Sequence, residues 1–301
     1  MKRVLISLLL CVLLISSLCA CGTVPDGEEE NTLTVAASTY PIALLADAVT
    51  EGVDGVTVKA VINQEISCVH DYTLTTTDMQ TIESADILLL NGAGLDDFMD
   101  DVLAVYDGTV ADCSENVTLL TMAHGETDPH IWMDPARAAV MAQNIAEALS
   151  KTDPDNADIY RQNAEEAALR LTALRDELYG EVCGNDAYCQ ELITFLDGFG
   201  YFADTLGLTI LRAIEEEAGS EASAQDIAEM IDLVRAHRLP VIFGEVNGSH
   251  SSAEAIARET GVEVHDLTLI MNGDVSDGLD AYEAALRANV EALRIPEGGA
   301  A

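Results

Sequence analysis

Short apolar runs alternate with segments of helical period along the chain from residue 32 onward. In the first half, the apolar runs predict strands over residues 32–38, 56–62, 86–92 and 117–120. The segments between and after them predict helices over residues 40–51, 75–85, 95–106 and 135–150. Strands that alternate with helices form parallel sheets with helices on their faces, so the pattern predicts an α/β lobe.

The second half repeats this pattern. Its apolar runs predict strands over residues 191–195, 208–214, 239–245 and 262–267. Ser223 and Asp226 resemble a capping box that opens a helix, and a last helix is expected over residues 279–293. We therefore expect a second α/β lobe with a parallel sheet.

A long helix is predicted between the two halves, where Asp153 and Pro154 form an N-terminal signal. Apolar residues then recur at spacings of four and three, namely Tyr160, Ala164, Ala167, Leu171, Leu174 and Leu178. This stripe indicates a helix of about 27 residues, roughly 40 Å long, that acts either as a rigid strut or as an ordinary core helix. The resulting division is an N-terminal lobe over residues 32–152, a linking helix over residues 153–181 and a C-terminal lobe over residues 182–295.

The N-terminus has the pattern of an export signal. Two basic residues precede an apolar run that is shorter than the roughly 20 residues of a spanning helix. Residues 18–21 resemble the bacterial lipobox, which predicts a lipoprotein signal peptide over residues 1–20 and acylation of Cys21. The alternative is an ordinary signal cut near Ala20. Residues 21–31 are rich in Gly, Pro and acidic side chains, which is typical of a flexible tether.

Charge and cysteine content narrow the possible functions. The 301-residue chain has 14 Lys and Arg against 53 Asp and Glu, a net charge of -39. Because such a chain has no basic stripe to neutralise phosphates, we expect no nucleic-acid partner. Export permits a disulfide between Cys183 and Cys189, although free thiols are equally compatible with the sequence. The chain has no CxxC pair, which argues against a thiolate zinc site.

Two histidines follow predicted strands in motifs that constrain them. His70 stands in CVHDY after the strand at residues 56–62, and His130 stands between two Asp-Pro turns in DPHIWMDP. A constrained imidazole in a loop is a common ligand for a transition metal, with carboxylates that orient it. Either histidine could instead be a cap or a polar contact. A third segment that could take part in a site is TFLDGFGYF, over residues 194–202.

Together these segments resemble the metal-binding lipoproteins of ABC transporters for zinc and manganese. The family's motifs read like PHDYEPTPSD, DPHxWxDP and FHDAFGYF, and here they stand as VHDYTLTTTD, DPHIWMDP and FLDGFGYF. The resemblance implies two lobes joined by a long backbone helix, with one metal ion in the crevice between the lobes. It also implies delivery of Zn²⁺ or Mn²⁺ to a membrane permease that a cytoplasmic ATPase drives.

By this resemblance, His70 and His130 are the two metal ligands of the N-terminal lobe. The family's third ligand, a His or Glu, falls on Leu196, which has no donor atom, and its fourth, an Asp just after the last strand, falls on Thr268. Nearby residues could compensate, namely Glu245, Asp266, His265 and His250. We prefer Glu245, which ends its strand where a crevice is expected, either as a ligand or as a residue that orients one. Asp266 is the further candidate, because it shares strand parity with Thr268.

These observations favour an exported lipoprotein that binds a divalent transition metal for an ABC importer and acts as a monomer. We expect Zn²⁺, because the remaining family ligands are imidazoles, with Mn²⁺ as the alternative. The sequence has no nucleophile elbow, HExxH helix or phosphate-binding loop, so we expect no enzyme activity. The rival interpretation is a scaffold with a degraded metal site that serves as a surface adhesin.

Overall fold

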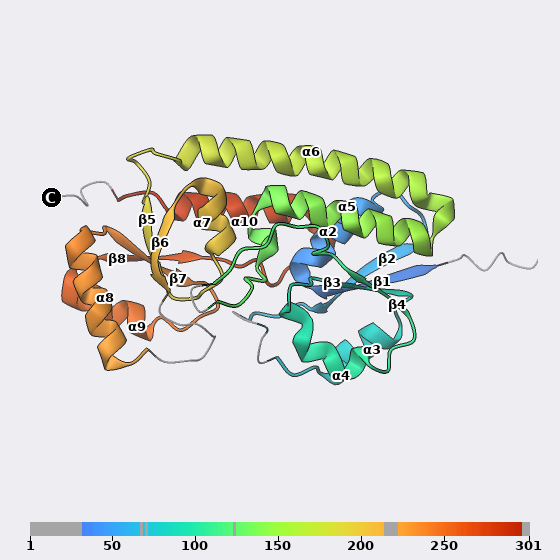
Figure 1. Ribbon diagram of the computed structural model, residues 1–301, viewed down its shortest axis with the longest axis horizontal. Coiled ribbons are helices and arrows are strands. Elements are labelled where there is room, and N and C mark those ends of the chain that lie inside the picture. Colours follow the sequence, from blue (N-terminus) through green and yellow to red (C-terminus); the bar gives the residue numbers. More distant parts are fainter. Residues whose placement is uncertain (1–31, 67–68, 70–71, 123–124, 214–221, 297–301) are drawn as a thin grey trace, which may run out of the picture. The chain divides into compact units, whose positions relative to one another are not determined.

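The structure, a computed structural model, describes residues 32–66, 69, 72–122, 125–213 and 222–296 (Figure 1). Its first sheet has the order β2-β1-β3-β4 and contains β1 (Leu33–Thr39), β2 (Val56–Ile62), β3 (Ile87–Leu90) and β4 (Thr109–Asp112). The second sheet has the order β6-β5-β7-β8 and contains β5 (Glu191–Thr194), β6 (Thr209–Ala213), β7 (Val241–Glu245) and β8 (Glu263–Leu267). All neighbouring strands pair in parallel, which confirms the predicted α/β class.

Helices cover both faces of the first sheet. One face packs against α2 (Tyr40–Thr50) and α5 (Pro135–Thr152), and the other lies near α3 (Thr76–Glu83) and α4 (Asp100–Leu103) (Figure 1). The helix starts follow the local sequence: Thr75 and Asp78 form a capping box on α3, and Asp134 accepts the Ala136 N–H before α5.

The second sheet also lies between helices. On one side, α8 (Ala224–His237) and α9 (Ser251–Thr260) enclose a small apolar cluster, and on the other lie α7 (Gly200–Leu206) and α10 (Gly278–Ala292) (Figure 1). The predicted capping box of Ser223 and Asp226 is present at the start of α8. The hydrophobic pattern along the chain did not predict α7 or α9.

The long helix between the sheets is α6 (Ala157–Val182), and its predicted apolar stripe is buried. It begins three residues after the expected start, because Pro154–Asn156 form a 3-10 turn first. The Asp153 carboxylate accepts hydrogen bonds from Asn156 and the Tyr160 hydroxyl rather than capping α6. The helix packs along α5, α2 and α10, so it is a packed helix with one buried face as well as a connection.

One hydrophobic cluster extends through both sheets. It includes Val35 and Leu88 from the first sheet, Leu192 and Phe243 from the second, and Leu286 from α10. Since α10 follows the last strand of the second sheet and packs against α2 and α6, it joins the two halves of this core.

Two predicted elements of the first half are wrong. Residues 117–120 form no strand, and the fourth strand is β4 instead. Residues 95–106 form no single helix, but a 3-10 segment (Leu95–Met99) followed by α4. No helix in the described part of the chain is long and apolar enough to cross a membrane. Among the described cysteines, Cys113, Cys183 and Cys189 form no disulfide, so the pairing of Cys183 with Cys189 is absent.

Candidate metal centre

His130 is a buried histidine whose ring is oriented by a carboxylate. Its side chain follows the turn Asp128-Pro129, and only 4% of the residue is exposed. The Asp128 Oδ1 atom accepts the His130 backbone N–H at 2.9 Å and lies 2.9 Å from Nδ1. A carboxylate beside Nδ1 makes that nitrogen the donor, so a metal ion bound to this ring would be held through Nε2, as in carboxylate–histidine–metal triads.

The segment FLDGFGYF packs directly on this histidine and on its carboxylate. A Cβ atom placed on Gly198 would lie 3.1 Å from His130 Nε2, and one on Gly200 would lie 2.5 Å from Asp128 Oδ2. The Tyr201 hydroxyl donates to the Asp128 carbonyl at 2.9 Å and accepts the Leu120 N–H at 2.9 Å. The second and third sequence motifs therefore form one packed unit, and Gly200 permits the close approach of its backbone to the carboxylate.

A second group of buried polar residues supports the His130 loop from the first sheet. Asn91, which follows β3, donates to the Pro129 carbonyl at 3.0 Å. The backbone N–H groups of Asn91 and Gly92 donate to Asp96 at 3.3 and 2.7 Å. Burial raises the pKa of Asp96 to about 6, although hydrogen bonds from Ser38 and the two backbone amides lower it in part.

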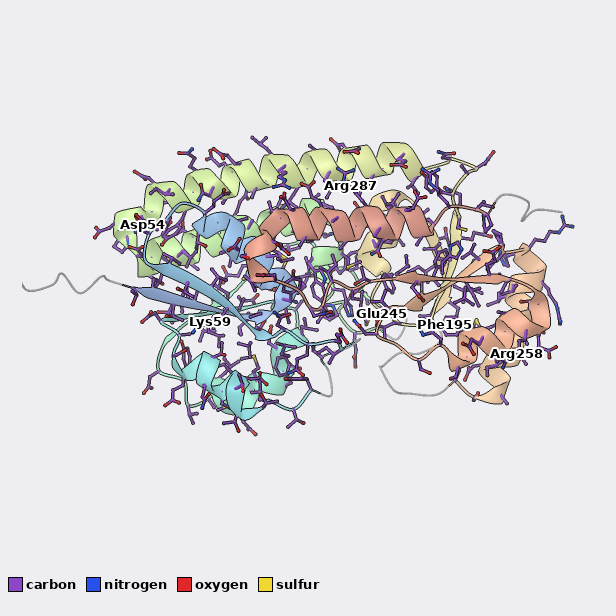
Figure 2. The ribbon with its side chains drawn as sticks, turned by 180° about the vertical axis from the view of Figure 1, so that it is seen from behind. Asp54, Lys59, Phe195, Glu245, Arg258 and Arg287 are labelled. Carbon is purple, nitrogen blue, oxygen red and sulfur yellow. The ribbon has the colours of Figure 1, made fainter. Side chains whose placement is uncertain are left out.

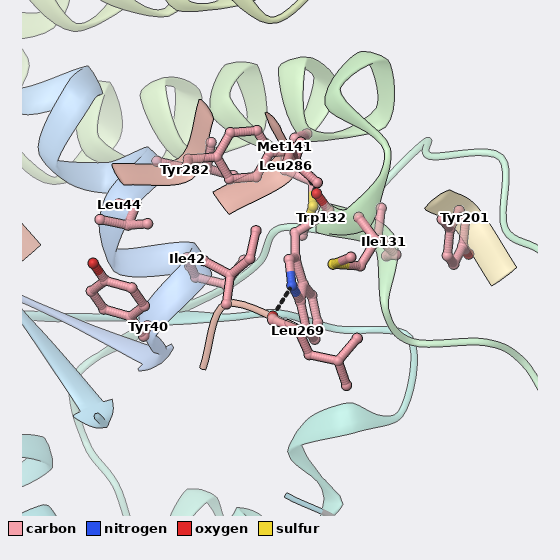
Figure 3. Packing of buried hydrophobic residues seen from close by; sticks show 14 of the residues in the cluster. Tyr40, Ile42, Leu44, Ile131, Trp132, Met141, Tyr201, Leu269, Tyr282 and Leu286 are labelled. Atoms are coloured by element: carbon pink, nitrogen blue, oxygen red, sulfur yellow. Dashed lines mark hydrogen bonds between the residues drawn. The ribbon is translucent and has the colours of Figure 1, made fainter. Parts of the chain in front are cut away.

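Trp132 connects this loop to the second half of the chain. Its indole N–H donates to the Leu269 carbonyl at 2.9 Å, as Figure 3 shows. The Trp132 carbonyl accepts a hydrogen bond from the Tyr282 hydroxyl of α10. The loop after His130 is therefore held by both the segment that follows β8 and the last helix.

Glu245 is a buried carboxyl group at the end of β7 (Figure 2). Only 2% of the residue is exposed, and Oε2 accepts the Asn247 N–H at 2.7 Å. Within the described part of the chain, Oε1 has no hydrogen-bond partner. Burial raises the pKa of Glu245 to about 7, while the backbone N–H groups of Asn247 and Leu269 lower it in part. A buried carboxylate with an open lone pair is suited to bind a cation.

Leu269 lies next to both His130 and Glu245. A Cβ atom on Gly198 would lie 2.8 Å from Leu269 Cδ1 as well as 3.1 Å from His130 Nε2. The backbone N–H of Leu269 faces the Glu245 carboxylate. The Leu269 side chain thus lies near one candidate ligand, and its backbone N–H lies near the other.

Asp266 is in a different setting. Its Oδ1 atom lies 2.7 Å from His250 Nε2, and both side chains are partly exposed. The register of β7 and β8 pairs Asp266 with Gly244 and Leu267 with Glu245. Because adjacent residues of a strand point to opposite faces, Asp266 and Glu245 lie on opposite faces of the sheet. The structure therefore places Asp266 with His250 rather than with His130. This pair holds the pKa of His250 above its usual range.

Leu196 and Thr268, at the two positions where the chain departs from the family's ligands, have structural contacts: Leu196 packs in the core, and Thr268 forms hydrogen bonds that hold the backbone. Leu196 is 4% exposed and belongs to the large hydrophobic cluster. The N–H and C=O of Thr268 bond to the Asn289 amide at 2.8 and 2.9 Å, and its hydroxyl accepts the Ile270 N–H at 2.9 Å. His265, another candidate ligand, donates a hydrogen bond from Nδ1 to the Ala292 carbonyl at 2.7 Å, and this bond links β8 to α10.

Two predicted residues, His70 and Cys21, lie outside the described residues. Within the described residues, no three His, Cys, Asp or Glu side chains are close enough to share one metal ion. The candidate centre described by the structure therefore consists of His130 and Glu245. Asn91 and Asp96, which support the His130 loop, were not predicted from the sequence, whereas Tyr201 lies in the segment at residues 194–202 that was. The sequence does contain a clue to Asn91 and Asp96, because both are polar residues that come shortly after the apolar run at residues 87–90.

Comparisons with known proteins agree on one family. A family model described as the zinc-uptake complex component A, periplasmic (ZnuA), matches residues 35–295. The manganese-binding lipoprotein MntA of Halalkalibacterium halodurans is 25% identical over 302 residues, which cover 97% of each chain. The iron-binding protein YfeA of Yersinia pestis is 29% identical over 200 residues, which cover 65% of this chain and just under two thirds (64%) of YfeA. A crystal structure of ZnuA covers 88% of this chain and 100% of its own, with 27% identity and a TM-score of 0.76.

The fold and the family match define an extracytoplasmic solute-binding protein for metal ions. The chain belongs to the zinc-uptake complex component A family, whose model matches most of its length. It is a divalent-metal-binding component of an ABC uptake system and not an enzyme, as expected from the sequence.

Proposed function

We propose that this chain captures Zn²⁺ outside the cell and delivers it to the permease of an ABC importer. The observation that carries the proposal is the placement of His130 and Glu245 around Leu269, each buried and each with a metal-binding atom. His70, by its motif, is the third ligand. Two imidazoles, one carboxylate and a water molecule would complete the four-coordinate geometry that Zn²⁺ prefers.

Mn²⁺ is the alternative cargo, because relatives of this chain carry names that refer to zinc, manganese or iron. Mn²⁺ favours more oxygen ligands than this donor set contains, which supports zinc. We propose that the lobes divide as the sequence predicts, at residues 152 and 182, and that Asp266 binds His250 rather than the cargo.

Metal titration of the full-length chain tests the cargo. The chain is purified in mild detergent, stripped with a chelator, and titrated with Zn²⁺ and with Mn²⁺ by calorimetry. We expect one Zn²⁺ to bind with submicromolar affinity and His130→Ala to weaken binding at least about 100-fold. His237→Ala is the matched control, because His237 contacts Glu191 on the surface of the second half.

The same titration separates this proposal from an adhesin with a degraded site. Absence of binding by the natural chain, together with binding by Leu196→His, would reject metal capture and favour the degraded scaffold. Binding by the natural chain that survives His130→Ala would show that the ion is held elsewhere.

We further propose that Cys21 carries a lipid anchor that keeps the protein on the outer face of the cell membrane. The lipobox-like sequence at residues 18–21 supports this, as does the name lipoprotein of the MntA relative. Mass spectrometry of the exported chain is expected to show an acylated N-terminal Cys21. Release of Cys21→Ala into the medium would agree, whereas an unmodified N-terminus at another residue would refute the anchor.

A further inference from the structure

The segment that follows β8 carries an apolar side chain to the candidate metal centre. Leu269 is fully buried, and its Cδ1 and Cδ2 atoms would lie 2.8 and 3.0 Å from a Cβ atom on Gly198. His130 Nε2 borders the same point at 3.1 Å. The two methyl groups and His130 Nε2 therefore border the same small space beside Gly198, which stays open because residue 198 has no side chain.

The backbone that carries Leu269 is fixed at an energetic cost. Ile270 has a φ of 62°, in the left-handed region that a β-branched residue rarely adopts, and it is 4% exposed. The Thr268 hydroxyl accepts the Ile270 N–H, and the Trp132 indole donates to the Leu269 carbonyl, so both polar groups of the peptide between Leu269 and Ile270 are held. Farther along, the Asn63 side chain donates to the Gly273 carbonyl at 2.8 Å and accepts the Gly273 N–H at 2.9 Å. These contacts fix Leu269 firmly in its position.

We infer that Leu269 is a specificity-determining residue, an apolar wall that limits the number of ligands around the bound ion and so favours Zn²⁺ over Mn²⁺. The inference rests on the proposed function. Zn²⁺ is satisfied by four ligands in a tetrahedron, whereas Mn²⁺ favours an octahedral shell of oxygen atoms that includes water. Hydrocarbon beside Nε2 excludes the additional water molecules that an octahedral ion needs. Leu269 therefore acts against Mn²⁺ rather than in favour of Zn²⁺, which is a means of achieving specificity by rejection.

Truncation of this wall tests the inference. Affinities of the full-length chain for Zn²⁺ alone and for Mn²⁺ alone are measured by competition with a chelator, for the natural chain and for Leu269→Ala. We expect the ratio of Zn²⁺ to Mn²⁺ affinity to fall by about 10-fold or more, mainly through tighter Mn²⁺ binding. Leu269→Asn, which keeps the size of the side chain and adds an oxygen donor, is expected to shift the ratio in the same direction.

Leu286→Ala is the matched control. It removes an equally buried leucine of the same hydrophobic cluster from α10. It is expected to lower the melting temperature and to leave the affinity ratio unchanged. The absorption spectrum of the Co²⁺-loaded protein gives a second readout: intense visible bands indicate tetrahedral coordination, and they should weaken in Leu269→Ala.

The outcomes distinguish this inference from the proposed function. If the natural chain binds neither ion, the proposed function fails. If it binds Zn²⁺ but the ratio is unchanged in both Leu269 variants, or falls equally in Leu286→Ala, Leu269 has only a packing role and the inference is overturned. If Leu269→Ala does not fold, the Leu269→Asn ratio and its Co²⁺ spectrum decide.

Discussion

Glu245 carries a carboxyl group in a setting that favours its neutral form. Its pKa rises from 4.5 to about 7, chiefly through burial. Between these values the folded protein keeps a proton that the unfolded chain has lost, so stability falls as pH rises through this window, and the loss is complete above about pH 7. We therefore expect metal-free Glu245→Gln to be more stable than the natural chain at pH 8, by up to about 3 kcal/mol, with little difference near pH 4.5.

Thermal unfolding at several pH values in the presence of chelator measures this difference. Glu165→Gln, on the exposed face of α6, is the control and should give no pH-dependent gain. An equal gain for Glu245→Gln at pH 5 and pH 8 would contradict a buried ionisation as its source. Added Zn²⁺ should stabilise the natural chain more than the variant, because the Glu245 carboxylate can bind the cation and a neutral glutamine amide binds it far more weakly.

Two aspartates of the motif DPHIWMDP have different tasks, and the same substitution should separate them. Asp128 orients His130, so Asp128→Asn should weaken Zn²⁺ binding by about 10- to 100-fold. Asp134 pairs with Arg137 at 2.6 Å, so Asp134→Asn, which can still cap α5, should lower stability by about 1–2 kcal/mol through the lost charge and leave affinity intact. Calorimetric titration and thermal unfolding of both variants check this. Equal effects on affinity would show that the motif acts only as a rigid loop.

At the scale of elements, α10 is joined to the end of β8 by one amide side chain. Asn289 is 1% exposed and bonds to both the N–H and the C=O of Thr268. Asn289→Ala would leave two partly buried backbone groups without this partner, so we expect a loss of roughly 1–3 kcal/mol in the free energy of unfolding. By contrast, Arg170 of α6 bonds Asp280 and Glu283 of α10 on an exposed surface, and Arg170→Ala should cost less than about 1 kcal/mol. Denaturant unfolding of the two variants measures this difference, and a larger loss for Arg170→Ala would refute it.

The sequence predicts best those helices whose start or buried face is determined by their own residues. The capping boxes at Thr75 and Ser223 and the buried stripe of α6 are local patterns, and the structure contains them. Residues 117–120 show why a short apolar run misleads. Their backbone is bonded by side chains from elsewhere: the Tyr201 hydroxyl accepts the Leu120 N–H, and Arg137 donates to the Thr118 carbonyl. A loop held in this way is as apolar as a strand, and only tertiary contacts distinguish the two.

The candidate site was predictable to a similar extent. The two Asp-Pro turns identify His130, and the position of Glu245 at the end of a strand marks it as a candidate. Gly198 lies close to His130 although the two are 68 positions apart in the sequence. Trp132 bonds to Leu269 across 137 positions. No local pattern predicts either contact. The separation of Asp266 from Glu245 depends on the register of β7 and β8, which strand parity alone does not give.

At the scale of the whole molecule, the two sheets are expected to unfold together. One hydrophobic cluster passes through both halves, and α10 returns from the second sheet to pack against α2 and α6 of the first half. Neither half can lose its packing without exposing apolar surface of the other, so a single cooperative transition is expected. Trp132, the one tryptophan of the chain, bonds to Leu269 of the second half and so reports on the contact between the halves. Tryptophan fluorescence and far-ultraviolet circular dichroism should therefore give coincident unfolding curves in denaturant, with and without Zn²⁺. A fluorescence transition that precedes the loss of secondary structure would show instead that the halves separate first, and release of the metal ion could then proceed through that opening.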